Sequence, residues 1–206
     1  MNIIVHSSLL LIAYWAFCEG QTDYSKIDPE KKQYMNYTKE MLNGDTELFL
    51  KWGVGGPMHN NTLICWFSNK NGDDDVGYRR TVRFYNKTDL VNHWKTRDTY
   101  YYVGADNYTP KVVVSSHISA TPDPETSGVY TLLFATPFCF VMGILGDNYN
   151  STCLLWAQRG HNHTIKKHCE EAFNFNCSGV NDTLYHRGRR QCNLTNTDEA
   201  PKVSIL

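Results

Sequence analysis

The sequence predicts an all-β protein: an eight-stranded antiparallel up-and-down barrel with a short N-terminal helix and a C-terminal helix. Eight segments rich in β-branched and aromatic residues follow one another, and segments rich in Gly, Pro, Asn and Asp separate them. Helical patterns flank this block on both sides. With 41% apolar residues in 206, the chain can form one packed core. A barrel also removes exposed sheet edges, whereas a two-sheet sandwich, the alternative, explains the terminal helices less well.

Each element has a local signal. The expected strands are residues 47–52, 62–68, 78–86, 91–103, 111–119, 129–136, 139–145 and 152–158. The fourth segment is long enough for a break within it. In the expected first helix, residues 29–42, Pro29 favours the start and Asn43-Gly44 the stop. A second helix is expected at 164–174. The tail, residues 177–206, is polar, carries cysteines and has no clear periodicity.

The N-terminus has the pattern of a signal peptide. Residues 3–17 (IIVHSSLLLIAYWAF) form a run of 15 that only His6, Ser7 and Ser8 interrupt. Such a run is short for a membrane span and fits a signal-peptide core, with a signal anchor as the alternative. We expect cleavage after Gly20, so that residues 1–20 are a signal peptide and residues 21–206 form one secreted domain. We expect a monomer that does not bind a membrane.

The charge balance excludes one function class. The chain has 20 Lys and Arg against 21 Asp and Glu, whereas nucleic-acid-binding proteins carry a clear basic excess. Its 13% aromatic content also argues against a disordered chain. We therefore expect a folded protein with no nucleic-acid partner.

Cysteines and asparagines also indicate the secretory pathway. Of seven cysteines, Cys18 would leave with the signal peptide, and an even number in an oxidising compartment predicts three disulfides with 15 pairings open. The six are Cys65, Cys139, Cys153, Cys169, Cys177 and Cys192. Nine of the 18 asparagines begin an N-x-Ser/Thr triplet, which predicts a glycosylated surface. Eight are candidates for glycosylation: Asn36, Asn60, Asn86, Asn107, Asn150, Asn162, Asn181 and Asn193. The ninth, Asn176, is a doubtful acceptor because Cys177 is its central residue.

The sequence offers no metal, cofactor or catalytic site. There is no C-x-x-C pair for zinc, and His161, His163 and His168 have no carboxylate or Cys that completes a ligand set. The acidic run at 73–75 lacks calcium-loop spacing, and the basic run at 187–190 is best interpreted as a solvated surface, with a processing site or a sulfated-glycan patch as alternatives. G-x-S-x-G, H-E-x-x-H and P-loop motifs are absent. We expect a protein that is not an enzyme.

One motif resembles a known family. From Cys139 the chain reads CFV, then 12 residues, then LLW, then 12 residues and Cys169. This frame resembles the signature of the tick salivary lipocalins of the histamine-binding family, and Cys65, Cys192 and the N-terminal helix are similar as well. The resemblance implies a barrel that sequesters a small host inflammatory mediator. It also implies the disulfides Cys65–Cys192 and Cys139–Cys169, which leaves Cys153 and Cys177 to pair.

The chain departs from the amine-binding members at two positions. Where those members carry Asp after the first Cys and Glu before Leu-Trp, this chain has Phe140 and Leu154. Because an ammonium in a low-dielectric interior needs a carboxylate or an aromatic face, we expect weak affinity for histamine or serotonin. An amine could still bind through acids on other strands, such as Glu47 or Asp89, or over a Trp ring.

Strand alternation predicts the ligand-binding wall. If Cys139, Cys153 and Cys65 face outward to disulfide partners, their neighbours face inward. The expected ligand-binding residues are Ile64, Trp66, Phe140, Met142, Leu154 and Trp156, and Ile144 should face inward with them. This wall suits an apolar ligand such as an eicosanoid, a fatty acid or a sterol. The alternatives are a barrel packed solid, and a scaffold whose loops or glycans bind a host immune protein such as a complement or cytokine component.

Overall fold

A computed structural model describes residues 23–72, 77–145, 151–158, 163–180, 184–186 and 192. The expected signal peptide and the acidic and basic runs at 73–75 and 187–190 lie outside these residues. So do His161 and the sequons at Asn150, Asn162, Asn181 and Asn193, as well as the side chain of His163. In the described residues no helix is long and apolar enough to cross a membrane.

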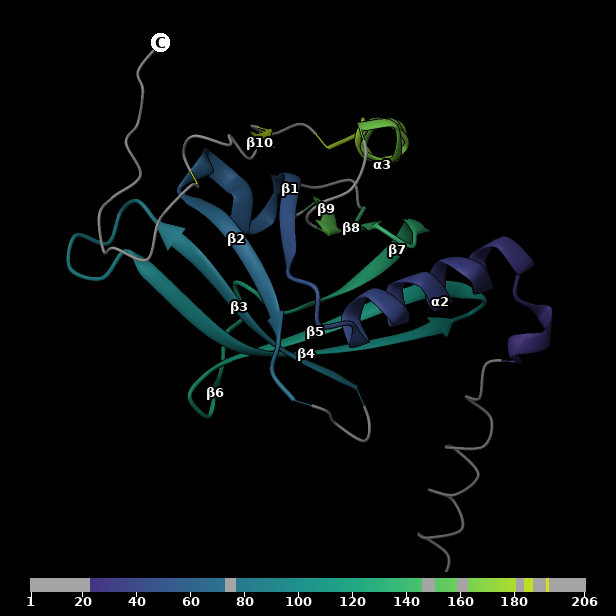
Figure 1. The fold of residues 1–206 in the computed structure, drawn as a ribbon, viewed down its shortest axis with the longest axis horizontal. Coiled ribbons are helices and arrows are strands. Elements are labelled where there is room, and N and C mark those ends of the chain that lie inside the picture. Colours follow the sequence, from purple (N-terminus) through teal and green to yellow (C-terminus); the bar gives the residue numbers. More distant parts are fainter. Residues whose placement is uncertain are drawn as a thin grey trace, which may run out of the picture.

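Eight antiparallel strands form a closed barrel (Figure 1). They are β1 (Leu48–Gly55), β2 (Leu63–Lys70), β3 (Tyr78–Asn86), β4 (Trp94–Asp106), β5 (Thr109–Ile118), β7 (Gly128–Thr136), β8 (Cys139–Ile144) and β9 (Thr152–Gln158). Each pairs with the next in the chain, and β1 pairs with β9 over seven residue pairs from Leu48–Gln158 to Gly55–Thr152. The predicted barrel is therefore confirmed. Two short strands extend it: β6 (Thr121–Pro122) pairs with β5, and β10 (Tyr185–His186) pairs with β1.

The N-terminal helix closes one end of the barrel. After the short 3₁₀ helix η1 (Tyr24–Lys26), α2 (Pro29–Asn43) begins where the Asp28 carboxylate accepts a hydrogen bond from the Glu30 N–H at 2.8 Å. Its Met41 and Leu42 are buried and join the core inside the barrel. Connections between strands alternate ends, so the β1–β2, β3–β4 and β5–β7 connections lie at the other end, which we call the mouth.

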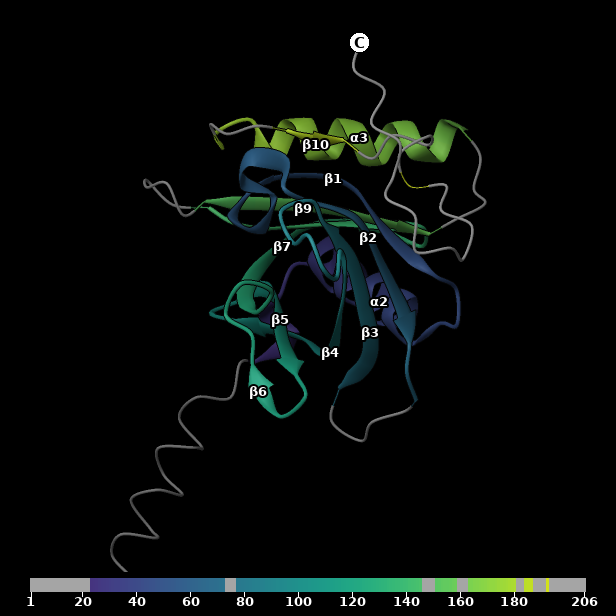
Figure 2. The same ribbon diagram turned by 90° about the vertical axis from the view of Figure 1, so that its left-hand side faces the viewer.

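The C-terminal helix lies outside the barrel. α3 (His163–Cys177) packs on the outer face of β8 and β9, as Figure 2 shows. Side chains of β8 and β9 consequently alternate between two cores. Phe140 and Met142 belong to the core inside the barrel, whereas Val141 and Leu155 belong to the outer core beneath α3.

Several elements differ from the sequence-based expectation. β4 is continuous and begins at Trp94 rather than at residue 91, because the Asp89 carboxylate turns the chain by accepting hydrogen bonds from the N–H groups of Val91 and Asn92. β1 continues through Gly55, which the glycine-rich composition had predicted to be a turn. Ile144, expected to face inward, is 38% exposed at the end of β8.

Candidate functional site

The barrel encloses a small cavity. Its volume, measured as the space open to the centres of water-sized spheres, is about 30 Å³. This is room for about two water molecules, so a mediator enters only if side chains move. Thirteen residues line it: Leu50, Pro57, Met58, Trp66, Val82, Tyr101, Val114, Ser116, Thr126, Tyr130, Met142, Leu154 and Trp156.

Four of the six expected ligand-binding residues line this cavity: Trp66, Met142, Leu154 and Trp156. Ile64 and Phe140 are buried in the same inner core, at 2% and 1% exposure, but do not line it. A bulge in β2 explains Ile64: Cys65 has a φ of 57°, and the register with β3 shifts between Ile64 and Phe67, which alternation alone does not reveal. Pro57 and Met58 also line the cavity, and no sequence pattern indicated this because they belong to a predicted turn.

The wall of the cavity carries no formal charge. None of the 13 lining residues is an Asp, Glu, Lys, Arg or His. The polar part is made of hydroxyl groups: the Ser116 hydroxyl donates to the carbonyl of Thr126 at 3.2 Å and lies 3.0 Å from the Thr99 hydroxyl. Burial raises the pKa of Tyr101 and of Tyr130 to about 12, so both phenols are neutral at physiological pH.

Two indoles on the wall differ in their hydrogen bonds. Trp66 stacks on Phe84, with ring centroids 4.2 Å apart, and its Nε1–H donates to the carbonyl of Leu63 at 3.1 Å. Trp156 is 4% exposed, and its Nε1 has no hydrogen-bond partner among the described residues. An unpaired buried N–H is costly, so this donor favours a ligand that brings an acceptor.

A buried arginine adds positive charge at the closed end. Arg80 is fully buried and points its guanidinium at the α2–β1 connection, where it donates to the carbonyls of Leu42, Gly44 and Thr46 at 2.8–3.0 Å. Desolvation lowers the pKa of Arg80. Tyr101 interacts electrostatically with Arg80 and also lines the cavity, so the charge lies close to the ligand chamber.

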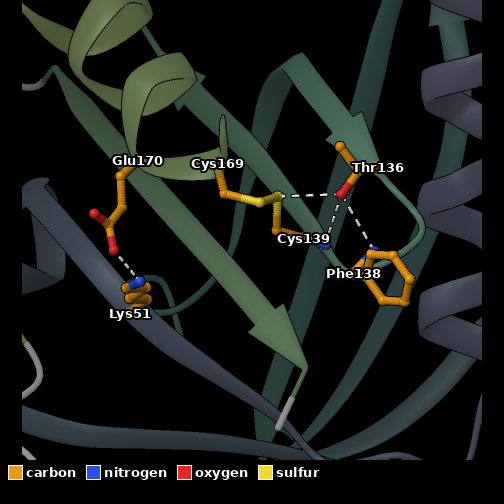
Figure 3. Close-up of a disulfide and its surroundings, with 6 residues drawn as sticks. All are labelled: Lys51, Thr136, Phe138, Cys139, Cys169 and Glu170. Atoms are coloured by element: carbon orange, nitrogen blue, oxygen red, sulfur yellow. Dashed lines mark hydrogen bonds and ion pairs between the residues drawn. A yellow bond between two sulfur atoms is a disulfide. The ribbon is translucent and has the colours of Figure 1, made fainter. Parts of the chain in front are cut away.

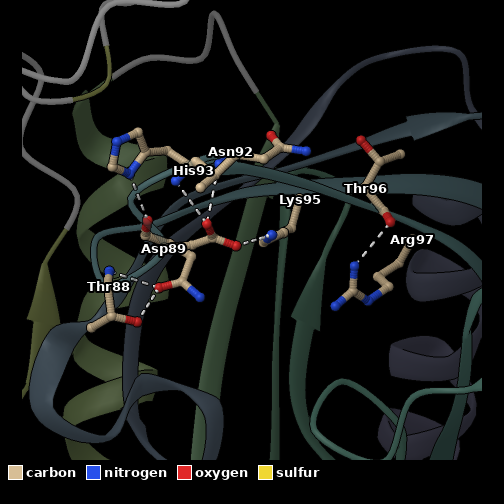
Figure 4. A network of polar contacts seen from close by, with 9 residues as sticks. Thr88, Asp89, Asn92, His93, Lys95, Thr96 and Arg97 are labelled. Atoms are coloured by element: carbon tan, nitrogen blue, oxygen red, sulfur yellow. Dashed lines mark hydrogen bonds and ion pairs between the residues drawn. The ribbon is translucent and has the colours of Figure 1, made fainter.

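The two acids proposed as alternative amine partners lie outside the cavity wall. Asp89 forms an ion pair with Lys95 in the β3–β4 connection (Figure 4). The Lys95 ammonium, with the N–H groups of Asn92 and Val91, holds the pKa of Asp89 well below its usual value. Glu47 precedes β1, and its Oε2 accepts a hydrogen bond from the Asn69 side chain at 3.4 Å. Neither carboxylate lines the chamber.

Segment η2 (Gly56–Asn61) forms the mouth side of the cavity. Its Pro57 and Met58 line the chamber, and Met58 is 1% exposed. At the same end of the barrel, Arg97 of β4 pairs with the buried Asp123 of the β5–β7 connection, and the Arg97 side chain is mostly buried. Figure 4 shows Arg97 Nη1 donating to the carbonyl of Thr96, at 3.1 Å.

Three disulfides hold the frame, in the pairs that the resemblance implies: Cys65–Cys192, Cys139–Cys169 and Cys153–Cys177. The last two fix α3 to β8 and β9. Figure 3 shows the Cys139–Cys169 bond, beside which Lys51 of β1 forms an ion pair with Glu170 of α3. The Thr136 hydroxyl accepts hydrogen bonds from the N–H groups of Phe138 and Cys139 at 3.2 and 3.3 Å, which shapes the turn before β8.

A second hollow lies on the outside, between α2 and α3. Its volume, measured in the same way, is about 560 Å³. It is lined by Tyr34, Leu133, Phe134, His168, Glu171, Ala172, Phe175 and Asn176. Phe175 at its rim is 82% exposed. We call this hollow the helix groove.

An antiparallel barrel closed on itself, with a chamber inside and a helix packed on its outer face, defines a lipocalin. Residues 25–192 match the family model of the tick histamine binding protein. The chain therefore belongs to the tick histamine binding protein family, a family of ligand-binding salivary lipocalins.

Solved structures similar to the chain are distant in sequence. Japanin from Rhipicephalus appendiculatus bound to cholesterol gives a TM-score of 0.47 at 14% identity, covering 70% of this chain and 93% of that one. Apocrustacyanin C1 gives 0.47 at 10% identity, covering 78% and 86%. Lobster apocrustacyanin A1 gives 0.44 at 12% identity, covering 82% and 86%. No curated protein matches the sequence.

Proposed function

We propose that this protein is secreted and sequesters a small apolar host mediator, such as a fatty acid, an eicosanoid or a sterol, in its barrel without chemical turnover. The observation that carries the proposal is the position of Leu154. It lines the chamber where amine-binding relatives have a glutamate, and no other lining residue supplies a carboxylate. A cationic amine would thus enter without a counter-charge.

Electrostatics support the same ligand class. The buried Arg80 guanidinium near Tyr101 disfavours a second cation and is compatible with a neutral or anionic ligand. The unpaired Trp156 Nε1–H favours a ligand that carries a hydrogen-bond acceptor, such as a carbonyl or hydroxyl oxygen, on an otherwise apolar body.

The test is a pair of titrations on protein secreted from eukaryotic cells. cis-Parinaric acid, a fluorescent fatty acid, is titrated by fluorescence, and histamine by calorimetry under the same conditions. We expect the fatty acid to bind at micromolar concentration or below and histamine to bind at least about a hundredfold more weakly, since a buried unpaired charge costs about 3–5 kcal/mol. Histamine binding more tightly than the fatty acid would overturn the proposal. Native mass spectrometry of the same protein then identifies any small molecule that co-purifies.

A second candidate function is a scaffold that binds a host immune protein. The helix groove favours it, because this groove is far larger than the chamber and exposes Phe175, and aromatic side chains are common anchors at protein interfaces. Binding of purified complement and cytokine components is measured by surface plasmon resonance. Phe175→Ser should abolish binding at this groove. Leu90→Ser, at an equally exposed apolar residue in the β3–β4 connection, is the matched control and should have no effect.

A further inference from the structure

Segment η2 covers one side of the chamber, and its Met58 side chain lies in the chamber wall. Met58 is 1% exposed although it belongs to a surface connection of six residues, and it contacts the chamber together with Pro57. Methionine is flexible and adapts to irregular spaces, so it can fill a position that a ligand also fills.

The space for Met58 depends on a glycine in the adjoining strand. A Cβ on Gly53 would lie 2.6 Å from Met58 Cγ and 3.3 Å from Leu154 Cδ2. No real side chain tolerates the first distance, so Met58 lies over β1 only because residue 53 has no side chain. The absence of a Cβ at this position thus has a packing reason.

Unusual backbone conformations bound the segment on both sides. At its start, Gly55 and Gly56 have φ values of 68° and 52°, and a Cβ on either would lie 2.0–2.1 Å from atoms of Ser151 and Thr152. At its end, Asn60 and Asn61 have φ values of 58° and 52°. Residues that tolerate several backbone conformations are typical of hinges.

We propose that η2 is a gate and that Met58 is its plug: in the unliganded protein Met58 fills the mouth end of the ligand chamber, and it withdraws when a ligand enters. Met58 then determines both access and the size of ligand that the barrel accepts. The ligand-displacement part of this inference rests on the proposed function, whereas the opening of the gate is a property of the protein alone.

The first test needs no ligand. Met58 and Met41 are 1% and 0% exposed, so a rigid barrel protects both equally from hydrogen peroxide. Peroxide oxidation is followed by mass spectrometry of the two peptides. If the gate opens, Met58 is oxidised about tenfold faster than Met41 or more, and Gly53→Ala, which expels the plug, accelerates Met58 further. Gly179→Ala, whose added Cβ contacts nothing within 4 Å, is the control. Equal oxidation rates of Met58 and Met41 overturn the gate.

The second test asks whether Met58 limits the rate at which a ligand enters the chamber. Met58→Ala removes the plug, whereas Met41→Ala removes an equally buried methionine of α2 that does not line the cavity. Stopped-flow mixing with cis-parinaric acid measures association. We expect Met58→Ala to raise the association rate constant and tighten affinity about tenfold, because an occluded state reduces apparent affinity by the fraction that is open. Met41→Ala should leave the association rate unchanged. Equal association rates in all three proteins overturn the gate. Failure of the probe to bind any of them contradicts the proposed function, and the oxidation experiment then decides the gate.

Discussion

Leu154 of β9 lies directly across from Gly53 of β1 in the seam that closes the barrel. A Cβ on Gly53 would be 3.3 Å from Leu154 Cδ2, so the two residues pack closely at the wall of the chamber. Residue 154, which is an acid in the amine-binding relatives, is therefore an apolar side chain here that packs against Gly53 at the chamber wall.

This contact predicts the effect of a charge at residue 154. Leu154→Glu should abolish binding of cis-parinaric acid, because an unpaired carboxylate in the chamber opposes both the apolar chain and the carboxylate of the probe. The expected loss is about two to three decades in dissociation constant, measured by fluorescence titration near pH 7.5. Leu154→Met, which keeps an apolar side chain of similar size, is the control and should change affinity little. Unchanged affinity in Leu154→Glu would show that the ligand lies elsewhere.

Arg80 should contribute strongly to stability. Arg80→Met leaves the carbonyls of Leu42, Gly44 and Thr46 without their charged donor, and we expect a loss of about 3–5 kcal/mol in the free energy of unfolding. Arg83→Met, three positions further along β3, is the matched control. Arg83 is exposed on the outer face and lies over the Trp94 ring at 5.4 Å, so it should cost about 1 kcal/mol or less. Urea unfolding of both variants measures the difference, and similar losses would contradict a special role for Arg80.

Because the Tyr101 phenol is buried, we expect the protein to lose stability at alkaline pH. Burial raises its pKa to about 12 in the folded protein, whereas the unfolded chain ionises near 10. The stabilisation of the protonated phenol is therefore fully present below pH 10 and is lost as the pH rises toward 12. Relative to Tyr101→Phe, the wild-type protein should lose about 2–3 kcal/mol of unfolding free energy over this range. Urea unfolding at pH 9 and pH 11.5 measures the change. A constant difference between the two proteins would mean that the phenol is accessible to water.

Glycosylation should differ between two described sequons. The side-chain Oδ1 of Asn86 accepts hydrogen bonds from the Thr88 N–H and hydroxyl at 2.9 and 2.7 Å, in an exposed turn (Figure 4). The Asn176 side-chain amide instead donates to the Ala172 carbonyl at 2.8 Å, back along α3. We expect Asn86 to carry a glycan and Asn176 to carry none, because Cys177 of that sequon is held in a disulfide. Glycopeptide mass spectrometry with and without enzymatic deglycosylation decides, and a glycan on Asn176 would contradict the expectation.

Local patterns in the sequence were sufficient for most of the strand framework. The bounds predicted for residues 78–86 and 152–158 agree with β3 and β9, because alternating polarity and turn residues are short-range signals. The inward orientation of Met142, Leu154 and Trp156 followed from their cysteine neighbours, since strand alternation carries one known orientation to the next residue.

Other features depend on contacts between residues far apart in the chain. The role of Arg80 is visible only once β3 lies beside the end of α2. The tail segment at Tyr185 is a strand because it pairs with β1, and the Tyr185 hydroxyl also accepts a hydrogen bond from the Cys65 N–H at 2.9 Å. The sequence by itself determined the barrel, its apolar lining and the missing acids, because these depend on residue type and strand period. Only the tertiary structure decided that the chamber is nearly filled and that Met58 closes it, because that depends on how a glycine-bounded connection folds over Gly53.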